Sequence, residues 1–341
     1  MKSIYLFMLG CLLISKASFS QSKEVQDLIG KGIQAHDAGQ YAAAIESYKK
    51  VLQLDSSNQL ARYEMANSFF AMKNYQAALD QGMLLIRTNS KYKEESYILA
   101  GSCLDLLNKP KEAISLYQEG IKQTPTSYLL QYNLALTFYK MQNYAAAKLA
   151  VQESLQLKPK HASSHLLMGF IQKETGHRIK AMLCLYNFLF LDPLDPRAKN
   201  SINVLNSLIA KGVDKKNDST INISISKNEN ESDEFQAAEL MVALLSASSN
   251  LEENKKLSKQ ELFVKNTESL FGMLGELKKN NKGFWWNYYV DYFSALAKEK
   301  HTEAFCYYIL KSKDDKEIKD WIEKNSDKMK ALFEWEENHK R

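Results

Sequence analysis

The feature that most constrains the fold of this chain is a repeat with a period of about 34 residues. Three of its five prolines, Pro125, Pro159 and Pro193, follow one another at intervals of 34 residues. An alanine stands twelve residues before each of them, and the alanines continue backwards at nearly the same spacing: Ala44, Ala78, Ala113, Ala147 and Ala181. A small residue precedes each alanine by twelve more positions: Gly32, Ala66, Gly101, Ala135 and Gly169. A constant period of this length predicts stacked structural repeats.

The spacing within one repeat predicts a hairpin of two helices. Apolar residues recur at helical intervals, first at Leu134, Ala135 and Phe138 and then at Ala147, Val151 and Leu155. The small residue on each helix lets the two helices approach closely where they cross, and Pro159 ends the second helix. A single hairpin cannot bury its apolar face, so we expect the hairpins to stack and to share one continuous core.

These repeats resemble the tetratricopeptide repeat family over about half of the chain. The expected units are Val25–Asn58, Gln59–Ser90, Glu94–Ser127, Tyr128–His161 and Ala162–Asp195. The chain departs from the family pattern at Gly82, which replaces a large residue, at Arg178, which replaces an aromatic one, and at Ser56 and Ser90, which replace a proline. The resemblance implies an all-α superhelical solenoid of five helix hairpins.

The family resemblance also implies where a partner binds. In such solenoids the first helix of each hairpin lines the concave surface. The inward positions here are Ile29, Ile33, Tyr63, Asn67, Phe70, Ile98, Tyr132, Leu136, Tyr139 and Phe170. A row of aromatic residues with few charges is suited to a protein or peptide partner. The alternative is that some of these residues pack between neighbouring hairpins.

One mode of binding known in the family is not expected here. The chaperone-binding members hold a terminal carboxylate with lysines and asparagines. Ile29, Ile33 and Leu99 stand at such positions in this chain, so we expect no carboxylate-clamp binding of a free C-terminus.

The N-terminus has the three parts of an export signal. Lys2 precedes an apolar run over residues 4–14, and Ser18-Phe19-Ser20 forms a small-x-small site before Gln21. A buried N-terminal helix is the alternative, and lipidation at Cys11 would need a polar tether that the following apolar residues do not provide. We therefore expect a signal peptide over residues 1–20 and a periplasmic or secreted protein. The apolar run is too short for a membrane span, which needs about 20 residues.

The rest of the chain divides into a solenoid over residues 21–213, a polar linker over 214–233 and a helical domain over 234–341. Residues 195–213 are expected to form a helix that caps the solenoid. Alternating isoleucines in the linker could form a strand, but a strand in an all-helical chain would lack a partner, which favours a flexible linker. Helices are predicted over residues 233–246, 259–277, 284–298, 301–312, 315–325 and 326–339. The solenoid is expected to fold without the helical domain.

Aromatic residues are concentrated in the helical domain. Phe284, Tyr288, Tyr292 and Leu296 form one stripe at helical spacing, and Trp285, Tyr289 and Phe293 form another. Such a wide stripe favours a protein core, and a sugar-stacking platform is the alternative. Tyr288, Tyr292, Ala304 and Tyr308 are spaced loosely as in the repeats, so this domain could contain a degenerate hairpin of the same kind.

No recognisable constellation for catalysis, metal binding or cofactor binding is present. His161 and His165 are four residues apart, but His161 is expected to lie outside the helix, and no third ligand is near in sequence. The net charge is +5 but only five basic residues are arginine, so nucleic-acid binding is not expected. Cys103, Cys184 and Cys306 are far apart and indicate buried apolar residues rather than disulfides.

Two classes of function remain. The first is a non-catalytic scaffold that binds a protein or peptide partner in the bacterial cell envelope. The second is a glycan- or cell-wall-associated protein, or a hydrolase, with its site in the C-terminal helical domain. An enzyme needs convergent polar groups, and the aromatic stripes offer few. The sequence therefore favours the scaffold.

Overall fold

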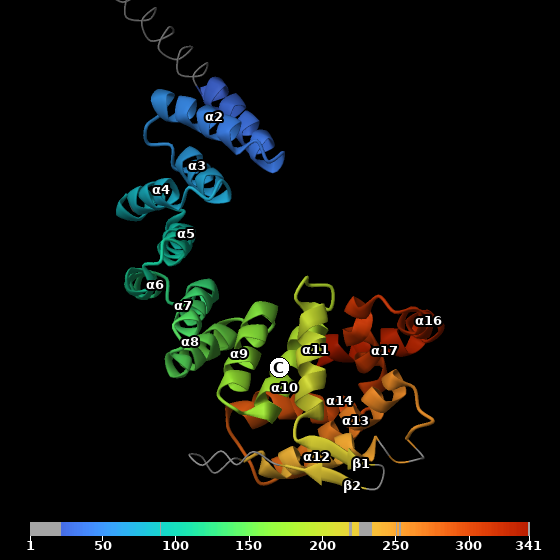
Figure 1. Cartoon of the computed structure of the whole chain (residues 1–341). Coiled ribbons are helices and arrows are strands. Elements are labelled where there is room, and N and C mark those ends of the chain that lie inside the picture. Colours follow the sequence, from blue (N-terminus) through green and yellow to red (C-terminus); the bar gives the residue numbers. More distant parts are fainter. Residues whose placement is uncertain are drawn as a thin grey trace, which may run out of the picture. The chain divides into compact units, whose positions relative to one another are not determined.

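The computed structural model of the chain describes residues 22–88, 90–217, 220–224, 234–249, 251 and 254–339. The predicted signal peptide, with Cys11, lies outside these residues. Contacts divide the chain into two compact units, Met1–Leu157 and Lys158–Arg341, and both are built mainly of helices (Figure 1). The expectation of an all-α tetratricopeptide repeat fold is confirmed.

Residues 22–157 form four successive helix hairpins. Their helices are residues 22–37, α2 (Tyr41–Leu54), α3 (Gln59–Ala71), α4 (Tyr75–Arg87), α5 (Lys93–Leu106), α6 (Pro110–Gln123), α7 (Tyr128–Lys140) and α8 (Tyr144–Leu157). From α2 to α8 each helix contacts the next along the chain. These hairpins correspond to the first four repeats expected from the sequence.

The turn inside each of these hairpins is made by one residue in the left-handed conformation. The φ angles of these residues are +74° at Gly39, +62° at Lys73, +59° at Asn108 and +59° at Gln142. Two backbone N–H groups then donate back to the first helix, as from Lys73 to Phe70 O and from Asn74 to Phe69 O. This arrangement satisfies carbonyl groups that a helix end leaves without partners. The turn therefore recurs every 34 or 35 residues with the same hydrogen bonds.

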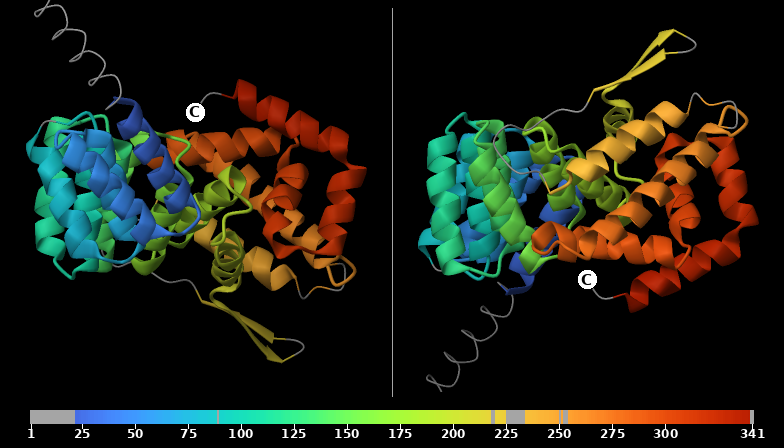
Figure 2. Two further views of the ribbon diagram at one scale, coloured as in Figure 1. Left: turned by 90° about the horizontal axis from the view of Figure 1, so that it is seen from above. Right: turned by 90° about the horizontal axis from the view of Figure 1, so that it is seen from below.

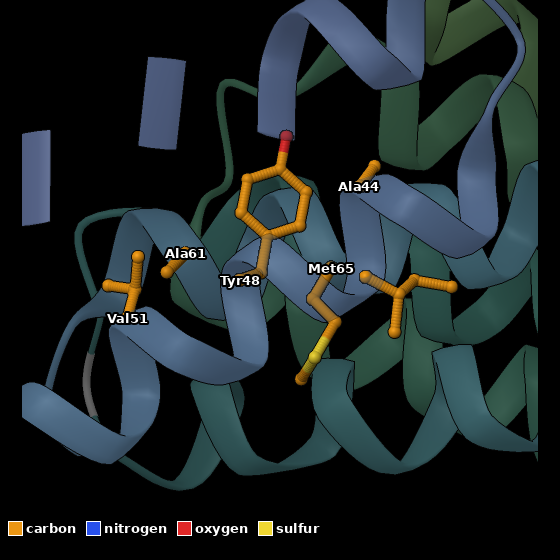
Figure 3. Packing of buried hydrophobic residues seen from close by; sticks show 6 residues of the cluster. Ala44, Tyr48, Val51, Ala61 and Met65 are labelled. Carbon is orange, nitrogen blue, oxygen red and sulfur yellow. The ribbon is translucent and has the colours of Figure 1, made fainter. Parts of the chain in front are cut away.

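The two helices of a hairpin cross where the repeat places its small residues. A Cβ atom on Gly101 would lie within 3.0 Å of three ring carbons of Tyr117, and Gly32 has the same relation to Tyr48. Tyr48 packs from α2 into a cluster with Met65 of α3 (Figure 3). Both tyrosine side chains are fully buried. A glycine on the first helix thus makes room for a tyrosine on the second.

The first helices of neighbouring hairpins also contact one another. Helix α5 contacts both α3 and α7. Among residues 22–157, no comparable set of contacts joins α4 to α6 or α6 to α8. The first helices are therefore closer together than the second helices, so the row of hairpins curves toward its first helices.

The second unit contains the fifth hairpin and everything after it. Its elements are α9 (Ala162–Glu174), α10 (Arg178–Leu191), α11 (Ala198–Ala210), β1 (Val213–Asn217), β2 (Thr220–Ile223), α12 (Gln236–Ser248), α13 (Lys259–Lys278), the π-helix η1 (Trp285–Val290), α14 (Asp291–Lys298), α15 (Thr302–Ile309), the 3₁₀-helix η2 (Leu310–Lys313), α16 (Lys316–Lys324) and α17 (Ser326–Asn338). The six helices predicted after residue 233 are all present, with ends shifted by at most three residues and with η1 and η2 at two of those ends.

Helix α10 is the centre of this unit. Twelve of its fourteen residues are buried, and it contacts α9, α11, α12, α15 and η1. Tyr186 of α10 is an example, because its hydroxyl lies 3.0 Å from Thr267 Oγ1 and its ring meets the ring of Phe271 edge to face. The helices after residue 233 therefore complete the core around the fifth hairpin. The contacts divide the chain at Leu157–Lys158, whereas the sequence suggested a division at residue 213.

The linker expected over residues 214–233 contains a β-hairpin. Strands β1 and β2 pair antiparallel, with Val213 opposite Ile223 and Lys215 opposite Ile221. The hairpin contacts α12 and projects from the helices of the second unit (Figure 2). The preference for a flexible linker is wrong at these residues. Ile221 and Ile223 do lie in a strand, and the partner that it needs is β1, the strand directly before it.

A turn of the same kind as in the first four hairpins joins α14 to α15. Lys300 has a φ of +65°, its N–H donates to Ala297 O, and the N–H of His301 donates to Leu296 O. Phe293 and Phe305 are twelve residues apart, as are the small residues of the true repeats, and their ring centroids are 5.8 Å apart. Because two phenylalanines occupy the crossing, the helices cannot approach as closely as in a repeat. The degenerate hairpin keeps the turn but not the packing.

Candidate partner-binding surface

Nine of the ten residues expected to bind a partner lie on the first helices of the first unit. We call them the first-helix face: Ile29, Ile33, Tyr63, Asn67, Phe70, Ile98, Tyr132, Leu136 and Tyr139. Ile33 is 38% exposed and the other eight are half-buried. In the same helices Leu134 and Ala135 are buried. The first-helix face is therefore reachable from solvent, while the neighbouring positions form the core of the hairpins.

Tyr63 is held by two neighbours on this face. Its ring stacks on Tyr92 with centroids 4.9 Å apart and planes 2° apart. Partial burial raises the pKa of the Tyr63 hydroxyl, with smaller contributions from Glu95 and Glu64, and a hydrogen bond with Asn67 opposes this rise. The hydroxyl therefore stays protonated at neutral pH and can donate a hydrogen bond. An ordered aromatic ring with a polar tip suits a binding surface, because little side-chain entropy remains to be lost.

Phe70 and Tyr139 serve the hairpin as well as the surface. Phe70 meets Tyr75 edge to face with centroids 5.5 Å apart, and Tyr139 meets Tyr144 at 5.8 Å. Both contacts join the end of a first helix to the start of the second helix in the same hairpin. Truncating either residue would therefore also loosen its hairpin. The tests below therefore use Tyr132, which lies away from the turn of its hairpin.

The structure adds two residues that the sequence reasoning did not consider. Asp105 accepts a hydrogen bond from Thr137 Oγ1 at 2.6 Å and lies 3.6 Å from Lys140 Nζ. His36 Nδ1 lies 2.9 Å from Ser68 Oγ. In both cases a polar residue at the twelfth position of one repeat meets a hydroxyl at the tenth position of the next. A polar residue at the twelfth position of one repeat, followed by a hydroxyl residue at the tenth position of the next, could have predicted these contacts from the sequence. These bonds fix neighbouring hairpins along the first-helix face.

The tenth expected residue, Phe170, is half-buried on α9 in the second unit.

Near the start of α9, the two histidines considered for a metal site have separate roles. His161 precedes α9 at its N-cap position and its Nδ1 lies 2.7 Å from Ser164 Oγ. His165 is buried, with Nδ1 2.8 Å from the Tyr289 hydroxyl and Nε2 2.8 Å from Pro159 O. Over the described residues, no group of three or more His, Cys, Asp or Glu side chains could hold a metal ion.

The aromatic stripes of the second unit are mostly core, as the sequence favoured. Tyr289, Tyr292 and Phe293 are buried, and Phe284, Trp285 and Tyr288 are half-buried. Trp286, which belongs to neither predicted stripe, is fully buried and stacks on Phe235 with centroids 4.5 Å apart. The π-helix η1 shifts the helix phase here, so stripes drawn at α-helical spacing missed it.

The three cysteines of the described residues are all buried. Burial raises the pKa of the Cys103 thiol to about 12 and raises the pKa values of Cys184 and Cys306 as well. Thiols in such surroundings stay protonated and are poor nucleophiles. None of the described helices is both long and apolar enough to cross a membrane.

Comparison with known proteins identifies the repeats. Residues 34–73 match the family model described as TPR repeat, and residues 129–161 match the one described as tetratricopeptide repeat. The "Small glutamine-rich tetratricopeptide repeat-containing protein 2" of Mycosarcoma maydis is 26% identical over 112 residues, which cover 33% of this chain and 32% of that protein. The chain thus spans about a third of the length of this curated relative.

Several solved structures are similar at low sequence identity. MamA is 20% identical with a TM-score of 0.43, and the match covers 52% of this chain and 96% of that one. A thermophilic TPR protein of Thermus thermophilus is 16% identical with a TM-score of 0.45, covering 54% and 98%. YrrB, titled a TPR protein with an unusual peptide-binding site, is 18% identical with a TM-score of 0.42, covering 56% and 97%.

The two family matches lie on the first, second and fourth hairpins of the first unit, and those hairpins have the turns and crossings that the repeat requires. This chain contains tetratricopeptide repeats. Proteins with such repeats bind protein or peptide partners and are generally non-catalytic scaffolds.

Proposed function

We propose that this protein is a non-catalytic scaffold of the bacterial cell envelope that binds a protein or peptide partner on the first-helix face. The observation that carries the proposal is the partial exposure of apolar and aromatic residues at equivalent positions of successive hairpins. Ile29, Tyr63, Ile98 and Tyr132 occupy the fifth position of the first four repeats, and all four are half-buried. A surface of this kind offers apolar area at regular intervals along the row of hairpins.

The fixed geometry of this face supports the proposal. Neighbouring first helices contact each other, and the Asp105–Thr137 and His36–Ser68 bonds join one hairpin to the next. The Tyr63 and Tyr92 rings stack on each other, which restricts both side chains. Binding to such a preformed surface costs less conformational entropy than binding to mobile side chains.

Photo-crosslinking tests the binding surface directly. A benzoylphenylalanine in place of Tyr132 should give discrete crosslinked products in an extract of the source cells, and mass spectrometry would identify them. The control places the same group at Leu149, which is 65% exposed on the second helix α8. Products from position 149 alone would show that the partner binds elsewhere on the repeats.

The proposed location rests on the N-terminal sequence. If the chain is exported, the native protein should begin at or close to Gln21, which mass spectrometry of its N-terminal peptide would show. A native protein that retains residues 1–14 would contradict export with cleavage, and a lipid on Cys11 would indicate a membrane anchor instead.

A further inference from the structure

A separate cavity lies within the second unit, between α11, the first turns of α13 and η2. Its volume is about 260 Å³. A water molecule occupies about 30 Å³ in the liquid, so the cavity has the volume of about nine water molecules. It shares no residue with the first-helix face, so an occupant here would be a ligand in addition to the partner proposed above.

The lining of this cavity divides into an apolar part and a cationic part. Ile209, Leu262, Phe263 and Leu310 supply apolar surface. Phe263 is held in place by Tyr186 of α10, with ring centroids 6.1 Å apart. An apolar wall of this kind favours a hydrocarbon or aromatic body.

The polar groups around the cavity are cations and amides. Lys259, at the first position of α13, and Lys313, at the end of η2, line it together with the amides of Asn206, Gln260 and Asn266. No acidic side chain is among the lining residues. Both lysines are exposed at the cavity rim, and no ion pair within the described part of the chain uses either one. The cavity therefore presents donors and positive charge without compensating carboxylates.

Asn266 has hydrogen-bonding capacity that the protein leaves unused. Its Oδ1 is buried and has no partner among the described residues. Polar atoms buried in proteins are usually paired, and this carbonyl oxygen accepts hydrogen bonds, so a water molecule or another donor must complete it.

We propose that this cavity binds a small amphipathic carboxylate, with its apolar body against Phe263 and Leu310 and its carboxylate between Lys259 and Lys313. An alkyl or aryl carboxylic acid of medium length has the required size, apolar body and single negative charge. The apolar walls contribute affinity, and the lysines select the anion over a neutral molecule of the same shape.

Titration of the full chain with octanoate, 1-octanol and octyl phosphate tests the proposal. Isothermal calorimetry and ligand-observed NMR should show octanoate binding in the millimolar range or tighter. The variant Lys259→Gln/Lys313→Gln should weaken octanoate binding about tenfold and leave 1-octanol binding unchanged, because only the anion loses a partner. Octyl phosphate shows whether the site accepts a phosphate as well, and binding tenfold tighter than octanoate would overturn the choice of a carboxylate.

Two further measurements control for position and folding. Lys282→Gln removes an exposed lysine that does not line the cavity and should leave octanoate binding unchanged. The double-lysine variant should melt within about 2 °C of the wild type. Octanoate binding that is absent at about 10 mM, or that is equally strong in the double-lysine variant and the wild type, would overturn the proposal.

Discussion

The substitution Gly101→Ala tests the packing at the hairpin crossing. Gly101 lies on α5, and a Cβ atom there would come within 3.0 Å of three ring carbons of Tyr117 on α6. The Tyr117 ring cannot easily move away, because it is 1% exposed and its hydroxyl lies 3.3 Å from Ser102 Oγ. The added methyl group must therefore push the two helices apart or force the ring out of its rotamer.

The expected magnitude combines two opposing terms. Replacing glycine by alanine inside a helix stabilises it by about 1 kcal/mol. Overpacking a filled core costs about 1–3 kcal/mol, and a clash with a buried ring on the partner helix belongs at the upper end. We therefore expect Gly101→Ala to destabilise the protein by about 2 kcal/mol. For a unit of this size, that corresponds to a melting temperature lower by about 4–8 °C.

Gly30→Ala is the matched control. Gly30 lies in the helix over residues 22–37, and a Cβ atom there would meet nothing within 4 Å. The substitution should stabilise by about 1 kcal/mol, so the two variants should differ by about 3 kcal/mol. Thermal and urea unfolding followed by circular dichroism measure both. Equal stabilisation by the two substitutions would refute a close crossing at Gly101.

A double-mutant cycle identifies the cause of the effect. The fourth repeat has Ala135 and Val151 at the positions that Gly101 and Tyr117 occupy in the third. Tyr117→Val removes the ring that the added methyl group would meet. Gly101→Ala should therefore cost at least about 1 kcal/mol less in the Tyr117→Val background than in the wild type. Additive effects would mean that the two residues do not interact.

Three further predictions concern the second unit. A fragment of residues 21–157 should unfold cooperatively. A fragment of residues 21–213 should bind a hydrophobic dye, because the apolar sides of α10 lose the helices that cover them. Dye binding by the shorter fragment and cooperative unfolding of the longer one would instead support a division at residue 213. Arg178→Ala should lower the melting temperature by about 10 °C, since it leaves Glu239 buried without its cation at a cost of about 3–5 kcal/mol; an unchanged melting temperature would contradict this. Burial lowers the pKa of His161 from 6.5 to about 4, so the unfolded chain binds the proton first as the pH falls, and stability should decline between pH 6.5 and pH 4. His161→Asn should reduce that decline in thermal melts, and identical pH profiles would refute the assignment.

Arg178 shows what an isolated departure from the repeat can mean. Its Nε donates to Leu208 O at 2.6 Å and its Nη2 donates to Ile209 O at 2.9 Å, at the C-terminal end of α11. Its Nη1 lies 3.4 Å from Glu239 Oε2. In the sequence, Arg178 stood out only because it replaces the aromatic residue of the family pattern. In the structure it joins the fifth hairpin to α11 and α12, so it is part of a larger core.

The repeats could be predicted because their determinants are local. A turn at Lys73 or Asn108 and a crossing at Gly101 each depend on residues of one hairpin, and the period repeats them. The ends of the later helices were also predictable, since caps and apolar spacing lie within each helix. Ser258, for instance, caps α13 by accepting from the N–H of Glu261.

The assembly of the second unit could not be predicted in the same way. Tyr186 packs against Phe271 and Phe305, which are 85 and 119 residues away along the chain, and no spacing rule connects them. One signal was present. Helix α10 is apolar on every side, which indicates a helix covered all round rather than one at the end of a solenoid.

The binding surface was predictable only in part. The fifth position of each repeat identified Tyr63 and Tyr132, and both are half-buried. The stacking of Tyr63 on Tyr92 was not foreseen, because Tyr92 belongs to the segment joining two repeats and has no place in the repeat pattern. Its position depends on how the second and third hairpins stack.

The affinity of a partner captured at position 132 for the wild type and for Tyr132→Ala tests the central claim most directly. Removing an aromatic anchor from the centre of an interface commonly costs about 2 kcal/mol, so the dissociation constant should rise about 30-fold. Leu149→Ala, on the second helix of the same hairpin, should leave the affinity unchanged, and all three proteins should melt within about 3 °C of one another. An affinity that is unchanged in Tyr132→Ala and reduced in Leu149→Ala would contradict the claim that the first-helix face binds the partner.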